Sequence, residues 1–284
     1  CATFVVAFAI VRDKYGSERS GQMITYLNGI VCFIPAMAPI LGAWLTVQFG
    51  WRMNFMFLTA FAIVGLLVTL LFFRETRPAD SHYQGHILDL RRFKPIIKTP
   101  VFLFNSLLCM VAMSAILVYV TLAPGWIITY LGGTVADFTF WFTLNAVLSI
   151  VASFITPMYI KRNSQRALRL GVSLLVFSGI LMLALSHIET AFALMLPILI
   201  SALGFALSLG SAAGMALSSF PKQAGTASAL LGAMQMSGAS MLVFLTQYLG
   251  LSTPWLIAFH LLLLAPLWLI LMSKKAHTLH PAKT

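Results

Sequence analysis

Residues 29–43 read Gly29-Ile-Val-Cys-Phe-Ile-Pro35-Ala-Met-Ala-Pro39-Ile-Leu-Gly42-Ala43. Pro35, Pro39 and Gly42 recur at helical spacing, so they share one face of an apolar helix. Each proline removes a backbone donor and crowds the carbonyl one turn earlier, which predicts a bend on that face. In a bilayer, neighbouring helices or a water-filled cavity have to satisfy the freed carbonyls. These residues leave two interpretations open: a kinked packing helix, or a helix that lines or gates a transport path.

The composition of the whole chain is that of a membrane protein. Apolar residues make up 60% of it and charged residues 9%, and the mean hydropathy is +0.94. The apolar residues also come in long uninterrupted runs, which is typical of transmembrane helices. Cys1, Cys32 and Cys109 lie far apart, in a spacing that suits neither a disulfide framework nor a metal site.

Apolar runs between polar breaks predict nine membrane segments. They lie near residues 1–11, 23–48, 53–73, 101–130, 138–160, 169–187, 191–217, 226–249 and 252–272. The first run ends at Arg12 and is too short to cross a bilayer. We therefore expect the chain to be a fragment that begins inside a helix.

The basic residues predict the orientation of these segments. If each segment crosses once, Arg52 is the single basic residue on one side, and all the other lysines and arginines fall on the opposite side. The positive-inside rule makes that opposite side cytoplasmic, together with the C-terminus. The net charge of +11 is thereby explained without nucleic acid.

The break at residues 74–100 is the longest polar interval and predicts a linker between two helical bundles. On this basis residues 1–73 form the remnant of an N-terminal bundle with its fourth to sixth helices. Residues 101–273 form a six-helix C-terminal bundle, and residues 274–284 a cytoplasmic tail. The predicted fold class is an all-α polytopic membrane protein with two bundles, built from repeats as in secondary transporters.

Polar residues inside the predicted segments are uncharged, because all seven acidic residues fall in loops or at helix ends. Buried amides and hydroxyls need partners, so four residues are candidates for lining a cavity: Asn28, Tyr119, Asn145 and Gln235. Stripes of small residues indicate close helix packing, including Gly225, Ser228 and Gly232, and also Ser201, Gly204, Ser208 and Ser211. His260 is expected to form hydrogen bonds within the bundle. No nucleotide-binding or nucleophile motif is present, so an enzyme is not predicted.

Several of these motifs together resemble one transporter family. The sequence Pro35-x-x-Ala38-Pro39-x-x-Gly42-Ala43 resembles the antiporter motif on the fifth helix of drug/proton antiporters of the major facilitator superfamily, in the form typical of the Bcr/CflA branch. Val11-Arg12-Asp13, Glu75-Thr76-Arg77-Pro78 and the segment from Ala224 to Gln235 support the resemblance. Within the branch, the sequence is most similar to a multidrug-resistance type. Ala43 and Ala38 stand where the motif usually has glycine.

The resemblance implies a proton-driven exporter of drugs or other small amphipathic compounds that works by alternating access. It implies that Pro35, Ala38, Pro39, Gly42 and Ala43 gate the path, and that the first three helices of the fold are missing. It also implies protons and a small molecule as partners, no cofactor, a monomer, and a location in a bacterial inner membrane. Two alternatives stay open: a single-substrate metabolite exporter or facilitator of the same fold, and a polytopic membrane enzyme or assembly factor.

Overall fold

The computed structural model describes residues 10, 37–38, 41–72, 93–220 and 224–273, without the side chains of Lys161 and Ala224. These residues are helical apart from short turns, with no strand among them. The chain divides into two compact units, Cys1–Ile87 and Leu88–Thr284. The boundary lies inside the predicted linker of residues 74–100. The assignment of the units as two transporter bundles stays a prediction.

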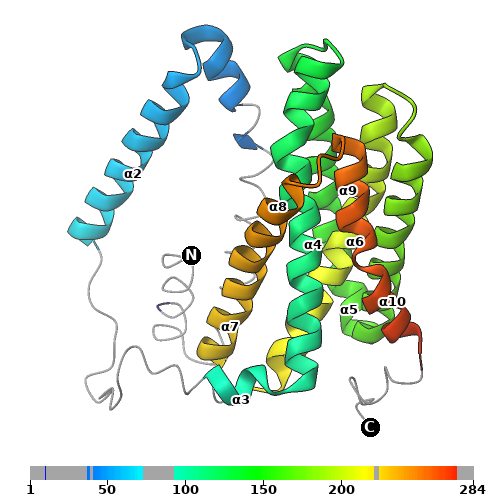
Figure 1. Cartoon of the computed structure of the whole chain (residues 1–284). Helices are drawn as coiled ribbons and strands as arrows, with labels where there is room; N and C mark the ends of the chain where they lie inside the picture. Colours follow the sequence, from blue (N-terminus) through cyan, green and yellow to red (C-terminus); the bar gives the residue numbers. More distant parts are fainter. Residues whose placement is uncertain (1–9, 11–36, 39–40, 73–92, 221–223, 274–284) are drawn as a thin grey trace. The chain divides into compact units, whose positions relative to one another are not determined.

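The first unit contains a helical hairpin, formed by residues 41–49 and by α2, Arg52–Phe72 (Figure 1). Gly50 makes the turn with a φ of +84°, a left-handed conformation that glycine adopts without a steric penalty. Across the turn, the Asn54 side-chain amide donates a hydrogen bond of 2.7 Å to Thr46 Oγ1. The hairpin thus has one polar contact that joins its two helices.

Most side chains of α2 are apolar and exposed. No residue of this helix is buried, and large side chains such as Phe61, Leu70 and Phe72 are at least 70% exposed. A water-facing helix of this composition is not stable, so lipid or another apolar surface has to cover it.

The second unit is an antiparallel bundle whose helices follow one another up and down (Figure 1). Its elements are α3 (Phe93–Ile97), α4 (Pro100–Pro124), the π-helix η2 (Gly125–Tyr130), α5 (Val135–Leu185), α6 (Ala191–Ser218), α7 (Ala224–Ala233), the π-helix η4 (Met234–Gly238), α8 (Ala239–Gln247), α9 (Thr253–Leu262) and α10 (Ala265–Met272). α3 lies within the segment predicted as a linker. It is held in place by Ile96, which is fully buried.

α5 contains two membrane segments separated at Asn163, where the backbone leaves the helical region. The first starts at a capping box in which Thr134 and Asp137 bond to each other's backbone amides. The second was expected to begin near residue 169. In the structure Asn163 Oδ1 accepts from the amide of Arg166 and caps a helix that already begins there. The predicted start was therefore too late, because the basic residues of this turn are helical.

α5 and α6 pack closely through two glycines. A Cβ on Gly171 would lie 2.7 Å from the amide nitrogen of Ser208, and one on Gly204 would lie 2.9 Å from the carbonyl of Gly171. On α6, the residues Ser201, Gly204 and Ser208 are buried. The packing interpretation of this small-residue stripe is confirmed: the missing side chains let the two backbones approach each other.

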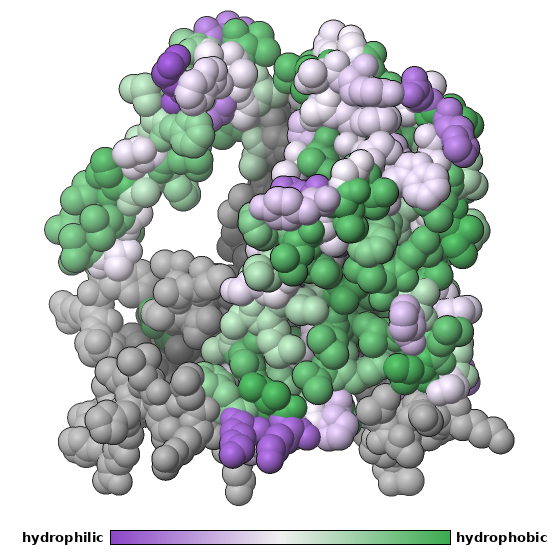
Figure 2. Space-filling model, in the orientation of Figure 1, coloured by the Kyte–Doolittle hydropathy of each residue, from purple (hydrophilic) through white to green (hydrophobic). Residues whose placement is uncertain are grey.

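Seven helices of the described residues are long and apolar enough to cross a membrane: Arg52–Phe72, Pro100–Tyr130, Val135–Ile160, Arg162–Leu185, Ala191–Ser218, Gly225–Gln247 and Thr253–Met272. They correspond to seven of the nine predicted segments. The segments at 1–11 and 23–48 fall largely outside the described residues, so the count of nine and the absence of three helices stay predictions. Figure 2 shows hydrophobic side chains over most of the lateral face of the second unit.

The charged residues of the second unit divide between its two ends. Its described basic residues, Lys94, Lys98, Arg162, Arg166 and Arg169, lie at the end where α4 begins. Its described acidic residues, Asp137 and Glu189, lie at the other end, where Tyr130 donates a hydrogen bond to Glu189. This division fits the orientation predicted from the positive-inside rule, in which the basic end is cytoplasmic.

Candidate transport site

Tyr119 on α4 contacts α5 through the ring of Phe142, and Asn145 lies on α5 near that contact. The Tyr119 side chain is 5% exposed, and its ring stacks on Phe142 at a centroid distance of 6.0 Å. Asn145 follows Phe142 by one helical turn on α5. The Tyr119 hydroxyl and the Asn145 side-chain carbonyl are both buried and have no hydrogen-bond partner in the structure. Two of the residues predicted to line a cavity thus each have a buried polar atom without a partner, and their cavity-lining role stays a prediction.

Other buried polar atoms without a partner lie on the same helices and on α6. They are Asn105 Oδ1, Ser106 Oγ, Thr143 Oγ1 and Ser211 Oγ. Buried polar groups normally have partners, and a group that lacks one is a candidate for binding water or a ligand. Asn105 and Ser106 lie about four helical turns along α4 from Tyr119, so these atoms do not form one site. Near Tyr119 the side chains are apolar and aromatic, with Phe138 and Phe142 packed against the core. This combination suits a ligand that is mostly apolar and has one or two hydrogen-bonding groups.

Gln235, the last of the four predicted cavity residues, is half-buried in the π-helix η4. η4 packs tightly on α4, because a Cβ on Gly238 would lie 2.5 Å from the Met110 sulfur. Short π-helical turns occur frequently at functional sites. The stripe that precedes it is less enclosed: Gly225 and Ser228 are exposed, and a Cβ on Gly232 would meet nothing within 4 Å. The packing role of this stripe stays a prediction.

The predicted gating motif is described only in part. Asn28, Pro35 and Pro39 lie outside the described residues, Ala38 is exposed, and Gly42 and Ala43 are half-buried. The carbonyl of Gly42 accepts a 2.8 Å hydrogen bond from the Thr46 hydroxyl, which in turn accepts from Asn54. The C-terminal end of the motif is thereby connected to α2, and the gating role of its residues stays a prediction.

His260 forms the most extensive buried polar cluster among the described residues. Its side chain on α9 is fully buried, with Nδ1 2.8 Å from Ser114 Oγ on α4 and Nε2 2.8 Å from Thr246 Oγ1 on α8. The expectation that His260 is hydrogen-bonded within the bundle is confirmed. Ser114 and Thr246 were not predicted, because nothing in their local sequence distinguishes them from other helix hydroxyls.

The two hydroxyls give the imidazole a choice of partners. A neutral imidazole has one N–H, so it donates to one hydroxyl and accepts from the other. Ser114 Oγ also lies 2.7 Å from the carbonyl of Val111, and Thr246 Oγ1 lies 2.9 Å from that of Leu242. The hydroxyl that donates to the ring has to release its own backbone carbonyl. The neutral ring therefore has partners on both sides and connects three helices. Among the described residues, no group of three His, Cys, Asp or Glu side chains could hold a metal ion.

The sequence model described as Major Facilitator Superfamily matches residues 1–243. The chain belongs to the Major Facilitator Superfamily. The predicted resemblance to this superfamily is confirmed, and the chain is a multi-pass membrane protein. Members of the superfamily act on small-molecule substrates in a membrane.

Curated members of this superfamily resemble the chain over most of its length. It is 32% identical over 252 residues to Multidrug resistance protein MdtL of Salmonella heidelberg and of Salmonella schwarzengrund. It is 31% identical to the protein of the same name from Salmonella paratyphi A. These alignments cover 88% of this chain and 62% of each relative. The chain thus spans somewhat less than two thirds of the length of the curated relatives it matches.

Proposed function

We propose that this superfamily member is an efflux transporter that exports drugs or other small amphipathic compounds by alternating access. The observation that carries the proposal is the buried Tyr119 hydroxyl on α4, which has no hydrogen-bond partner and whose ring stacks on Phe142 of α5; the Asn145 side-chain carbonyl on α5 is also buried without a partner. Such a site holds a substrate mainly through apolar contact and selects it through few hydrogen bonds. The names of the curated relatives support export of several drugs.

The proton gradient is the proposed driving force, so no cofactor is required. In this mechanism the bent face of Pro35, Pro39 and Gly42 closes against the opposing bundle as the two bundles rock. Alternating access of this kind needs closely packed surfaces that can separate and rejoin. The transporter is proposed to lie in a bacterial inner membrane with its C-terminus in the cytoplasm.

An efflux assay tests the proposal. The full-length gene, with the first three helices that are predicted to be missing here restored, is expressed in bacteria that lack their major exporters, and the cells are loaded with ethidium or with fluorescent phenolic and cationic compounds. The present chain expressed alone is predicted to be inactive and serves as a control. We expect faster efflux than from cells with an empty vector, and a protonophore should abolish the difference. Export of a single compound from a broad panel would favour the single-substrate alternative. No gradient-dependent efflux of any compound would contradict the proposal.

Tyr119→Phe tests whether the substrate reaches the α4–α5 contact. The hydroxyl has no partner in the protein, so its removal should leave the thermal stability unchanged. Loss of one hydrogen bond to a substrate should lower the transport efficiency about 2-fold to 10-fold, for compounds that have a hydrogen-bonding group. Compounds without such a group serve as the internal control. An equal loss for both kinds of compound would place the substrate elsewhere.

A further inference from the structure

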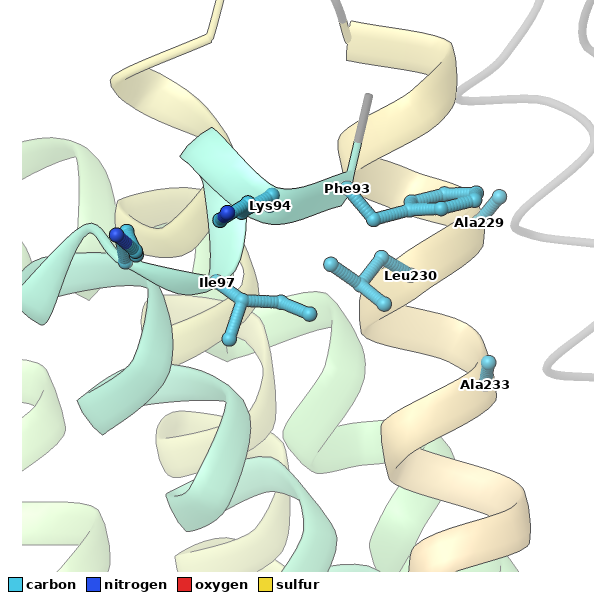
Figure 3. Close-up of a pocket in the computed structure, with 7 residues that line it drawn as sticks. Phe93, Lys94, Ile97, Ala229, Leu230 and Ala233 are labelled. Carbon is cyan, nitrogen blue, oxygen red and sulfur yellow. The ribbon is translucent and has the colours of Figure 1, made fainter. Parts of the chain in front are cut away.

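A groove lies between α3 and α7 at the basic end of the second unit (Figure 3). Its volume is about 630 Å³, which is within the range of sites for small molecules and lipid groups. Phe93 and Ile97 line it from α3, and Ala229, Leu230 and Ala233 line it from α7. In Figure 3 the Phe93 ring extends toward Ala229, and Leu230 lies beside the hollow that Ile97 borders.

The wall that α7 provides is suited to an alkyl chain. Ala229 and Ala233 are one helical turn apart and both exposed, so their small side chains leave a channel along the helix axis. Leu230 is half-buried beside them, and Ile97 is 42% exposed on the opposite wall. Apolar surface of this kind gains free energy when a hydrocarbon chain covers it in place of water.

The rim of the groove has a double positive charge. Lys94 and Lys98 line the groove and are one helical turn apart, since the amide of Lys98 donates to the carbonyl of Lys94 at 3.1 Å. Both are exposed, and neither ammonium group bonds to another described residue. Two lysines at this spacing can bind one phosphate group together. They lie at the end predicted to be cytoplasmic, where the bilayer surface contains anionic lipids.

From the positive rim and the apolar floor we propose that the α3–α7 groove binds one anionic phospholipid. Lys94 and Lys98 bind its phosphate, and an acyl chain lies along Ala229, Leu230 and Ala233. A soluble phosphate would leave the apolar wall uncovered. A zwitterionic lipid would present a cationic group beside the two ammonium groups. The anionic phospholipid is the ligand that satisfies both parts of the groove.

Native mass spectrometry of the purified protein in a non-ionic detergent tests the proposal. The protein is titrated with phosphatidylglycerol and, separately, with phosphatidylcholine of the same acyl chains. We expect preferential binding of phosphatidylglycerol. K94Q/K98Q should weaken this binding about 25-fold, since one basic residue at an anionic surface contributes about fivefold. K94R/K98R keeps both charges and should retain binding.

Two matched controls distinguish the contribution of the lysines to lipid binding from that of the apolar wall. K274Q/K275Q removes the same charge from the predicted tail and should keep wild-type affinity. Ala233→Phe fills the channel on α7 and should weaken phosphatidylglycerol binding with both lysines present, whereas Ala184→Phe, at an exposed position of α5, should not. A233F also keeps the test decisive if K94Q/K98Q does not fold.

Three results would overturn the proposal. The first is equal binding of phosphatidylglycerol and phosphatidylcholine. The second is an equal loss of binding in K94Q/K98Q and K274Q/K275Q, which would indicate attraction by net charge alone. The third is displacement of the lipid by inorganic phosphate at equal concentration with no effect of A233F, which would indicate a site for a soluble anion. None of these measurements depends on transport activity.

Discussion

At the scale of single residues, His260 shows how a polar side chain can be used within an apolar bundle. Its two ring nitrogens bond to hydroxyls from α4 and α8, and the ring itself comes from α9. A fully buried imidazole without these partners would cost several kcal/mol. With them, it becomes a specific connection between helices whose other contacts are apolar and non-directional.

His260→Ala should therefore destabilise the second unit. We expect the free energy of unfolding to fall by about 1–3 kcal/mol, because two interhelical hydrogen bonds are lost and a cavity remains. Reversible unfolding in mixed detergent micelles, followed by circular dichroism, measures the change. His187→Ala, at an exposed histidine of the same chain, should be within about 0.5 kcal/mol of wild type. Equal stability of the two variants would show that the cluster contributes nothing.

The sequence could place His260 inside a helix but could not identify its partners. Ser114, Thr246 and His260 are far apart in the chain, and helix hydroxyls usually bond to their own backbone one turn earlier. Tyr119 and Asn145 were easier to select, since a large polar side chain within an apolar run is conspicuous. The stacking of Tyr119 on Phe142 of α5 depends on how the helices pack, and the pattern of a single helix does not determine that.

At the scale of elements, glycines determine how close two helices come. Gly171 and Gly204 bring the backbones of α5 and α6 into contact, whereas Gly214, on the same α6, has nothing within 4 Å of where a Cβ would be. The predicted stripe contained Gly204 and not Gly214, but it could not identify Gly171 on α5 as the residue that Gly204 meets.

Gly204→Ala should be destabilising and Gly214→Ala should not. The added methyl on residue 204 would meet the carbonyl of Gly171 and the side chain of Leu175 at 2.9 Å, which should cost about 1–3 kcal/mol of unfolding free energy. At residue 214 the same change fills open space and removes the helix penalty of glycine, so stability should stay equal or rise by up to about 1 kcal/mol. Thermal unfolding of the two variants provides the comparison. Unchanged stability of Gly204→Ala would refute the close contact between α5 and α6 at this residue.

The π-helix η4 explains a limit of the sequence-based prediction. The stripe of Gly225, Ser228, Gly232 and Gln235 assumes 3.6 residues per turn throughout. From Met234 onward the turn is wider, so residues beyond it are rotated relative to α7. No residue in this segment is a reliable signal for a π-helix. A face predicted on α7 from a spacing of 3.6 residues per turn therefore does not continue at the same spacing on α8.

At the scale of the whole molecule, hydropathy predicted the seven described spans well, because long apolar runs have few stable alternatives in a bilayer. The boundaries were less accurate. Polar residues at helix ends, such as Thr134 and Asn163, extend a helix by capping it, and their contribution depends on backbone geometry that hydropathy ignores. The predicted orientation of the helices in the membrane rests on the distribution of basic residues alone, and it can be measured directly.

Thiol labelling of intact cells tests the orientation. In a protein whose three cysteines are replaced, His187→Cys should react with a membrane-impermeant maleimide, because residue 187 lies at the end predicted to face outward. Arg166→Cys should react only after the cells are permeabilised. Both native side chains are exposed, so reactivity reports the side of the membrane rather than burial. The reverse pattern would invert the predicted topology and place the α3–α7 groove in the outer leaflet.

The close contact of Gly171 and Gly204 has a consequence for biosynthesis. Only a short turn, residues 186–190, separates the second half of α5 from α6, so both halves of the contact leave the ribosome in succession. The pair can assemble as a hairpin in the bilayer before α7 to α10 have been synthesised. The earliest packed part of this unit would then be the template on which the later helices are placed.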